Sequence, residues 1–398
     1  MARSKQIFAL DLGTTKFCLA ALHQSAGRPD IQVCEVPALG MKRGMLVDFE
    51  EASRALNKLV EEAEARFKCD IRRVVVGVAG SHLKSRTVTG NMEIQDSLIK
   101  TIHVQSLTVD VENQCRSSHR EILHCIPIHF DVDSRDSVNN PIGLSGSHLS
   151  GSFFVIDADR SYLKDMIRLC NHCGLEVCQL YSEPFASASV TVDDQLKNLG
   201  VALADIGGGT TDGIIFQHGR PVSMFTINTA GNHMHRDLSV GLNIPLSDGL
   251  RIKEHYGLTD LPGFLDLKDI HGTLVRFSDQ RIRGILEARI LELGKFMFHS
   301  LVDHQGNLGG GILFTGGGSY LKGIDKFLGA KFGVSVKSQQ PHISLGMSHD
   351  WEYPATYATV IGLINLEIGR RKILHDESSA SWPKRYVYQF VNWIRELS

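Results

Sequence analysis

Short apolar stretches separated by turns open the chain. Residues 6–11, 16–23 and 31–37 are predicted strands, and a Gly-Thr-Thr turn separates the first two. A helix is predicted from Asp48, which opens a capping box and precedes apolar residues at helical spacing. The β-branched run at residues 73–78 predicts a strand covered on both faces. This mixture of strands and helix indicates an α/β domain.

The pattern changes between residues 81 and 157. Short polar stretches that alternate as strands do, such as 85–92 and 105–111, are joined by turns. We therefore predict a small α+β insertion in this part of the chain.

Helical spacing returns after the insertion. Residues 162–173 and 279–302 are predicted helices, and the second has a long apolar side. Residues 309–319 predict a strand and a glycine loop, followed by a helix at 320–332. Residues 369–381 are polar and lack periodicity, so they predict a linker to the C-terminal segment.

A repeated motif connects the two halves of the chain. Residues 8–16 read FALDLGTTK and residues 202–212 read ALADIGGGTTD. Both predict a strand, an aspartate, a Gly-Thr turn and a second strand. The aspartates, Asp11 and Asp205, are separated by close to half the chain length. A duplicated pair of domains explains this spacing.

The residue types of the repeat favour phosphate binding. Glycines let successive backbone N–H groups approach an anion, and threonine hydroxyls add donors. Asp11 and Asp205 are suited to face a hydrated Mg²⁺ between them, and Lys16 to neutralise phosphate charge. Two ordinary tight hairpins are the alternative, and the matched copies argue against it. A third loop, Gly316-Gly317-Gly318 before a predicted helix, supports a mononucleotide site.

Composition and charge narrow the class of protein. The 398 residues include 42 Lys and Arg against 44 Asp and Glu. This balance excludes a disordered chain and argues against a non-specific nucleic-acid binder. The length predicts two or more domains, and the apolar runs are too short to span a bilayer. Residues 1–21 resemble a secretion signal, but Asp11 and Lys16 interrupt the apolar stretch.

Eight cysteines are too sparse for a disulfide framework. Cys170, Cys173 and Cys178 with His172 are candidate zinc ligands, but no second Cys or His pair follows at the usual spacing. Small apolar thiols packed at a helix end are the favoured interpretation.

The three glycine loops, in this order, resemble the actin superfamily. Further stretches resemble the FtsA family of bacterial cell division proteins, and together they cover nearly the whole chain. The most specific is Asn-Pro-Ile-Gly-Leu-Ser-Gly at 140–146. The others lie at 40–44, 122–127, 230–232, 247–253 and 357–363.

The resemblance implies an actin-like two-domain ATPase fold, made of duplicated ribonuclease-H-like halves with an inserted α+β subdomain. It implies subdomain 1A at 1–81 and 159–190, 1C at 82–158, 2A at 191–230 and 303–368, and 2B at 231–302. A linker at 369–381 and an amphipathic membrane-targeting helix at 382–398 would follow.

The resemblance also implies a function. The chain is expected to bind ATP and Mg²⁺, with weak or no ATPase activity, and to form actin-like filaments. It is expected to lie peripherally on the cytoplasmic face of the inner membrane at the division septum, to anchor the tubulin-like FtsZ ring there, and to recruit later division proteins.

The nucleotide site is carried over motif by motif. Its expected residues are Asp11, Gly13, Thr14, Thr15, Lys16, Asp205, Gly207, Gly208, Gly209, Thr210, Gly231, Asn232, Lys253, Gly316, Gly317 and Gly318. Glu183 before Pro184 resembles the chaperone ATPases of the superfamily, where a carboxylate can position an attacking water. Capping of the following helix is the alternative role for Glu183.

Two surfaces are expected to bind partners. Arg281 and Arg289 match family positions that bind the C-terminal tail of FtsZ, although a solvated helix face would look the same. The terminal segment places Trp382, Tyr386, Phe390, Trp393, Ile394 and Leu397 at helical spacing. Basic residues lie mostly on its other side, which is typical of an interfacial membrane helix, and docking onto the protein core is the alternative.

Two other functions of the superfamily remain as alternatives. A small-molecule kinase would need a catalytic base near the γ-phosphate, and no dedicated acid stands out in the insertion. A chaperone ATPase would need a peptide-binding domain after Leu363, where the sequence leaves too little room.

Overall fold

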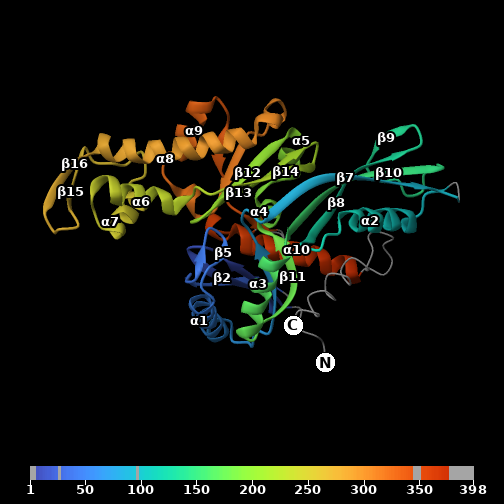
Figure 1. Ribbon diagram of the computed structural model, residues 1–398, viewed down its shortest axis with the longest axis horizontal. Coiled ribbons are helices and arrows are strands. Elements are labelled where there is room, and N and C mark those ends of the chain that lie inside the picture. The colour runs from blue at the N-terminus through green and yellow to red at the C-terminus, as the bar shows by residue number, and fades with distance from the viewer. Residues whose placement is uncertain (1–5, 26–27, 96–97, 344–350, 376–398) are drawn as a thin grey trace.

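The computed structural model describes residues 6–25, 28–95, 98–343 and 351–375. Its framework is two mixed five-stranded sheets (Figure 1). In the first sheet β2 pairs antiparallel with β1 and β3, whereas β6 runs parallel to β1 and β11. The spatial order is β3 (Arg28–Pro37), β2 (Lys16–Ser25), β1 (Ile7–Leu12), β6 (Arg73–Val78) and β11 (Glu176–Ser182).

The second sheet repeats this topology. β13 pairs antiparallel with β12 and β14, whereas β17 runs parallel to β12 and β18. Its order is β14 (Arg220–Ile227), β13 (Thr211–Gln217), β12 (Val201–Ile206), β17 (Ile312–Thr315) and β18 (Val336–Ser338). Strand order and direction therefore match one to one, and the duplication predicted from the sequence is confirmed.

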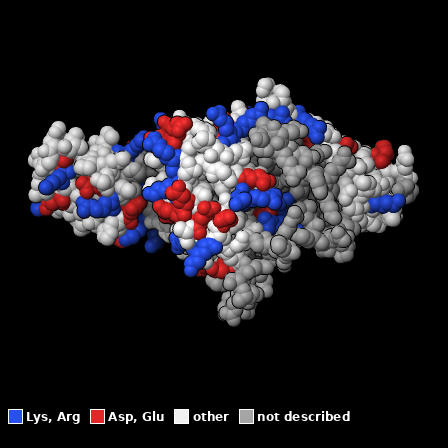
Figure 2. All heavy atoms as spheres, turned by 90° about the horizontal axis from the view of Figure 1, so that it is seen from below, with Lys and Arg blue, Asp and Glu red and all other residues white. Residues whose placement is uncertain are grey.

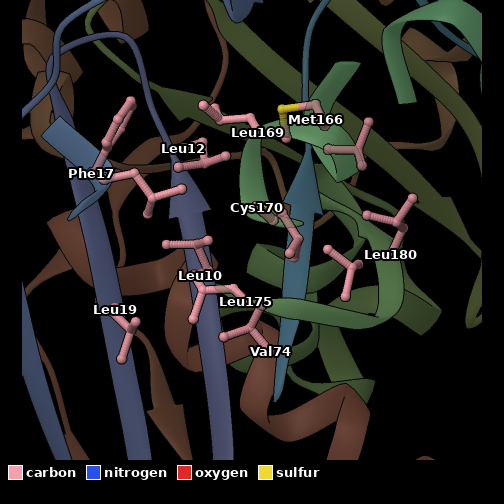
Figure 3. Packing of buried hydrophobic residues seen from close by; sticks show 14 of the residues in the cluster. Leu10, Leu12, Phe17, Leu19, Val74, Met166, Leu169, Cys170, Leu175 and Leu180 are labelled. Atoms are coloured by element: carbon pink, nitrogen blue, oxygen red, sulfur yellow. The ribbon is translucent and has the colours of Figure 1, made fainter. Parts of the chain in front are cut away.

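Successive side chains of β1 point to opposite faces of the first sheet and pack in two hydrophobic clusters. Phe8, Leu10 and Leu12 face helices α1 (Phe49–Phe67) and α3 (Arg160–His172). Figure 3 shows Leu10 and Leu12 in this cluster with Met166, Leu169 and Cys170 from α3. Of the predicted capping box of α1, the N-cap half is present, since the Asp48 carboxylate accepts the Glu51 N–H at 2.9 Å, whereas the Glu51 side chain pairs with Arg54.

The opposite face of the first sheet carries α4 (Glu183–Thr191) and α10 (Ala358–His375). The two helices pack so closely that a Cβ on Gly362 would collide with the Ala186 carbonyl oxygen. On its other side α4 contributes Ala188 to a cluster with β12 and β13 of the second half. Helix α4 therefore lies between the two sheets.

The end of α10 is fastened to the first sheet by a buried carboxylate. Glu367 accepts the Tyr181 hydroxyl at 3.1 Å and the guanidinium groups of Arg370 and Arg371 at 2.6 and 2.7 Å. Arg371 also donates to the backbone carbonyl of Gln6, just before β1, at 3.0 Å. Two charged guanidinium groups and one hydroxyl compensate the desolvation of this carboxylate.

The second half carries a group of helices at the far end of the molecule (Figure 1). Ile282, Leu286 and Ile290 form the buried side of the long helix α8. Besides its five-stranded sheet, this half contains α5 (Asp194–Leu199), α6 (Gly231–Leu242), α7 (Leu246–His255), β15 (Phe264–Lys268), β16 (Leu274–Ser278), α8 (Asp279–Ser300) and α9 (Ile324–Phe332).

The insertion forms a separate antiparallel sheet with one helix, at the opposite end of the molecule from α8 (Figure 1). Its order is β7 (Leu83–Glu93), β10 (His148–Asp159), β8 (Arg120–Val132) and β9 (Arg135–Val138), and the helix is α2 (Thr101–Cys115). At its base, buried Asp157 pairs with Arg86 and Arg120. Ser85 on β7 also accepts the Met224 N–H of β14 at 3.2 Å, so the insertion contacts both halves.

Three sequence predictions about elements are wrong. Residues 105–111 lie in helix α2, because Leu107 and Val111, four residues apart, are buried on one helix side. The helix predicted at 320–332 begins only at Ile324, since Gly323 adopts a left-handed conformation (φ 85°) and a 3₁₀ turn, Gly317–Tyr320, precedes it. Residues 369–375 of the predicted linker 369–381 belong to helix α10, in which Arg370 and Arg371 pair with Glu367.

The remaining elements are short. They are β4 (Met41–Lys42), β5 (Met45–Leu46), β19 (His342–Ile343), β20 (Trp351–Glu352) and 3₁₀ turns at Val302–Asn307 and Ala355–Tyr357. None of the helices in the described part combines the length and hydrophobicity that a transmembrane segment requires.

Candidate functional site

One cavity of about 1010 Å³ lies between the two halves. The turns of the two repeated hairpins form part of its wall, together with the N-terminus of α6, the side of α7 and the third glycine loop. It brings together every residue expected at the nucleotide site: Asp11, Gly13, Thr14, Thr15, Lys16, Asp205, Gly207, Gly208, Gly209, Thr210, Gly231, Asn232, Lys253, Gly316, Gly317 and Gly318.

The two hairpin turns meet across the cavity. A Cβ on Gly208 would collide with the Thr15 hydroxyl, and one on Gly209 would lie 2.6 Å from the Thr14 hydroxyl. Only glycine allows this approach, because any other side chain would push the turns apart. The turn of the second half is also fastened to α6, since the Gly231 N–H donates to the Gly207 carbonyl at 3.0 Å.

Two aspartates stand where the central strands end. The hydroxyls of Ser187 and Thr359 both donate to the Asp205 carboxylate, at 2.8 and 3.3 Å. These two hydrogen bonds orient the carboxylate. Burial raises the pKa of Asp11 to about 7, with the nearby Asp205 charge adding to the effect. Burial likewise raises the pKa of Asp205 to about 6. Both carboxylates are therefore placed where a cation would favour their ionised form.

The donor chemistry fits Mg²⁺ and nucleotide phosphates. Carboxylate oxygens suit a hard cation, and glycine N–H groups suit anionic oxygens. Within the described residues no three His, Cys, Asp or Glu side chains converge closely enough to hold a metal by themselves. A magnesium ion at Asp11 and Asp205 would accordingly take most of its ligands from water and phosphate.

Glu183 is the first residue of α4 and faces the same carboxylates. Burial, followed by the charges of Asp11, Asp212 and Asp205, raises its pKa well above the usual range. Glycine at position 77 leaves room for it, because a Cβ there would lie 2.8 Å from the Glu183 side chain. Glu183 is therefore a carboxyl group of raised pKa in the cavity wall.

Asp212 is a member of this cluster that sequence reasoning missed. It is 6% exposed and accepts the hydroxyls of Thr210 at 2.7 Å and Thr226 at 2.6 Å. The signal was present in the repeat, because Asp212 pairs with Asp205 across its hairpin where Cys18 pairs with Asp11 in the first. Both halves therefore contribute carboxylates to the cavity: Asp11, Glu35 and Glu183 from the first, and Asp205, Asp212 and Glu254 from the second.

Lys16 and Lys253 supply positive charge on opposite walls. Lys16 lies 2.5 Å from the Glu35 carboxylate and 4.2 Å from the centre of the Tyr357 ring. Sequence reasoning missed Glu35, which comes from the neighbouring strand β3. Lys253, on α7, has a side chain that is 15% exposed and lies 3.9 Å from Glu254.

Arg281 and Arg289 lie outside the cavity, on α8. Arg281 donates to the Gly241 carbonyl at 2.9 Å, and Arg289 donates to Asp237 at 3.0 Å and also pairs with Glu292. Both arginines thus connect α8 to α6. Basic and acidic side chains are interspersed at the end of the molecule that carries α7 and the β15–β16 hairpin (Figure 2).

The three candidate zinc-ligating cysteines do not line the cavity. Cys170 packs in the core of the first half, Cys173 lies 3.7 Å from the Ser53 carbonyl, and Cys178 lies 3.2 Å from Arg73 Nε. The expected membrane residues Trp382, Tyr386, Phe390, Trp393, Ile394 and Leu397 lie outside the described residues.

Comparisons with known proteins agree with this architecture. The family model for cell division protein FtsA matches residues 202–362, and the model for the SHS2 domain inserted in FtsA matches residues 80–157. The FtsA of Neisseria meningitidis serogroup B is 28% identical over 91% of this chain and 90% of its own length. The FtsA of Escherichia coli K12 is 26% identical over 99% and 97%.

Solved structures share the fold. A PilM–PilN type IV pilus biogenesis complex matches with a TM-score of 0.64 at 16% identity, over 91% of this chain and 98% of that chain. MreB5 of Spiroplasma citri bound to ADP matches with a TM-score of 0.56 at 16% identity, over 93% and 98%. With both sheets, the inserted domain and full-length relatives in agreement, this chain belongs to the FtsA family of bacterial cell division proteins, has the actin-like fold, and acts in cell division.

Proposed function

We propose that this protein binds ATP with Mg²⁺ in the cavity between its halves and polymerises as an actin-like filament on the inner face of the cytoplasmic membrane. There it anchors the FtsZ ring at the septum and recruits later division proteins. The observation that carries the nucleotide part is the convergence of both glycine hairpins, the third glycine loop and the two aspartates in one cavity.

Each wall of the cavity has a separate role in this proposal. The hairpin turns and the N-terminus of α6 hold phosphate oxygens through backbone N–H groups. Asp11 and Asp205 would hold Mg²⁺, which would supply positive charge beside the phosphates when bound. Lys253 contacts the nucleoside. The MreB5 structures, which share the fold, are bound to ADP and to AMPPNP, and this supports nucleotide binding by the present chain.

Glu183 is proposed to determine whether the bound nucleotide is hydrolysed. A carboxylate with a raised pKa at the cavity wall can accept a proton from water that attacks a phosphate. Burial, with the charges of the three aspartates adding to it, makes Glu183 a weaker acid than an ordinary glutamate. Weak or absent hydrolysis is part of this proposal, in which the protein acts as a nucleotide-dependent adaptor and not as a metabolic enzyme.

The assembly and membrane roles are proposed for other parts of the chain. Residues 231–302 form the subdomain that binds the FtsZ tail, through Arg281 and Arg289 on α8. Residues 82–158 form the inserted subdomain 1C, and residues 382–398 the membrane-targeting helix. A single such helix binds weakly, so filament formation would strengthen attachment by presenting many copies.

Calorimetry with ATP in the presence and absence of Mg²⁺ tests the nucleotide site. Wild-type protein is expected to bind ATP with Mg²⁺, and Asp205→Asn is expected to weaken binding by about tenfold or more, since it removes a full charge from the magnesium site. Asp194→Asn is the matched control, because that side chain is 93% exposed and pairs only locally with Lys197. Equal affinity of wild type and Asp205→Asn would contradict the assignment.

A further inference from the structure

A short hairpin in the cavity wall carries a residue that its turn does not favour. Strands β4 and β5 pair Lys42 with Met45, so Arg43 and Gly44 form a two-residue turn between them. Both residues have positive φ, 51° and 71°, as in a type I′ turn. Asparagine, aspartate or glycine is the usual first residue of such a turn, because a long side chain is strained there. Turn propensity therefore does not account for an arginine at position 43.

The turn is fastened to the first of the two repeated hairpins. The Gly44 N–H donates to the Thr14 hydroxyl at 2.9 Å. The Gly44 carbonyl accepts the hydroxyl of Tyr162, from α3, at 2.6 Å. Both polar groups of Gly44 are thus held, and Arg43 is the residue next to a direct contact with the turn that carries Thr14.

The guanidinium of Arg43 lines the cavity without a carboxylate partner. In the part of the chain that the structure describes, no side chain forms an ion pair with it. The two lysines of the site differ in this respect, since Lys16 lies 2.5 Å from Glu35 and Lys253 lies 3.9 Å from Glu254. Arg43 can therefore bind an anionic ligand without giving up an ion pair within the protein.

The positive charge of Arg43 acts across the cavity. Strand β5 lies on the side of the first half that faces the second (Figure 1). On the other side, burial and then the charges of Arg289 and Arg43 lower the pKa of His233. His233 belongs to the first turn of α6, the helix that fastens the glycine turn of the second half. Arg43 is therefore close to the space between the two glycine turns.

The turn of Arg43 also lies at the end of the cavity where carboxylates gather. Burial raises the pKa of Tyr162, and the negative charges of Glu183 and Asp212 add to the effect. Tyr162 is the residue that holds this turn, so Arg43 is near the carboxylate cluster. Lys253, the proposed nucleoside contact, lies on α7 in another wall. A nucleotide along the cavity would thus bring its phosphate end, and not its base, to Arg43.

We propose that Arg43 is a specificity-determining residue that binds the terminal phosphate of the nucleotide and so favours a triphosphate over a diphosphate. This inference rests on the proposed nucleotide site. The glycine turns offer backbone N–H groups to phosphate oxygens, and a guanidinium adds a fork of charged donors that matches two oxygens of one phosphate. A terminal phosphate has more free oxygens than an inner one, so it gains most from this fork.

Titration calorimetry on the full chain with ATP, ADP and AMP, each with Mg²⁺, tests the proposal. Arg43→Asn removes the guanidinium and introduces a residue that suits the turn. The variant is expected to bind ATP about fivefold to twentyfold more weakly than wild type, and ADP and AMP within about twofold of wild type. Arg43→Lys keeps the charge but not the fork, and is expected to retain part of the preference for ATP over ADP.

Two controls separate this role from a structural one. Without nucleotide, Arg43→Asn is expected to melt at the same temperature as wild type or higher, because asparagine adopts the turn with less strain. Arg72→Asn removes the same charge from a side chain of the first half that is 81% exposed and does not line the cavity. This variant is expected to bind all three nucleotides as wild type does.

Unchanged ATP affinity in Arg43→Asn would overturn the proposal. An equal loss for ATP and ADP would also overturn it, because the contact would then not lie on the terminal phosphate. A variant that melts lower and loses all three nucleotides alike would give Arg43 a structural role instead. If wild-type protein binds none of the nucleotides, the proposed nucleotide function itself fails, which is distinct from a wild type that binds ATP while Arg43→Asn binds it equally well.

Discussion

The Nε2 atom of His124 accepts a hydrogen bond from the backbone N–H of Ser182 at 3.0 Å. His124 belongs to β8 of the insertion, and Ser182 immediately precedes α4, whose first residue, Glu183, lines the cavity. Burial lowers the pKa of His124 to about 3, so the ring stays neutral and can accept. The inserted domain thus holds one end of the helix that carries the cavity glutamate.

Removing this ring is expected to destabilise the protein. His124→Ala leaves the N–H of the fully buried Ser182 without a partner. It also removes the ring contacts with Tyr181 and Phe185, whose ring centres lie 5.7 and 4.9 Å from that of His124. An unsatisfied buried donor alone costs about 1–3 kcal/mol. Urea unfolding should show this loss. His129→Ala on the same strand, with a side chain 37% exposed, is the control and should change the unfolding free energy little; similar losses in both variants would argue against a specific role for His124.

Glu112 on α2 should make the insertion less stable at high pH. Burial raises its pKa to about 7, the Glu121 charge adds to this, and Arg116 opposes it. Between pH 4.5, where an unfolded glutamate ionises, and pH 7 the folded state binds more protons, so the stability that this group contributes falls as the pH rises.

The variant Glu112→Gln should therefore melt higher than wild type at pH 8, by roughly 1–3 °C, and the gap should close at pH 5. Thermal melts at both pH values measure it, and Glu61→Gln at an exposed position of α1 is the control. A gap that is the same at pH 5 and pH 8 would show that Glu112 does not titrate in this range.

Because Arg289 pairs with Asp237, FtsZ-tail binding can be tested by changing either residue, with opposite expected effects. Arg289→Glu should weaken binding of an FtsZ tail peptide by roughly tenfold, because like charges then face the acidic peptide. Asp237→Asn keeps the arginine and removes its competing carboxylate, so binding should be equal or tighter. Fluorescence anisotropy with a labelled peptide measures both, and nucleotide affinity should change in neither. If the peptide binds both variants as it binds wild type, Arg289 serves only to hold α8 against α6.

Deleting residues 382–398 should abolish binding to anionic vesicles while leaving ATP affinity unchanged. The deleted segment contains Lys384, Arg385 and Arg395, and each basic residue near anionic lipid contributes about 1 kcal/mol. Wild type should consequently bind neutral vesicles roughly a hundredfold more weakly than anionic ones. Co-sedimentation measures this, and a truncated protein that still pellets with anionic vesicles would place the membrane contact elsewhere.

The sequence predicts the duplicated framework well because its signals are local. Each hairpin of the repeat has its strands, turn and aspartate in one continuous stretch, 7–25 in the first and 201–217 in the second, so the pattern is visible without tertiary contacts. Asp212 and Glu35 were missed because their importance depends on which residue stands opposite or on the next strand, as Glu35 stands beside Lys16. The strand predicted at residues 105–111 was wrong because the local alternation of polar and apolar residues favoured a strand. Packing against the inserted sheet instead stabilises a helix there.

The carboxylate of Glu367 has a mechanical consequence. It binds Tyr181 of β11 and two arginines of its own helix, and one of these reaches the residue before β1. Tension applied to the chain beyond His375 would therefore be shared by two strands of the first sheet, and the last turn of α10 would resist peeling. Because Thr359 at the other end of α10 lines the cavity and donates to Asp205, an anchor at the C-terminal end would be connected to the cavity through this helix.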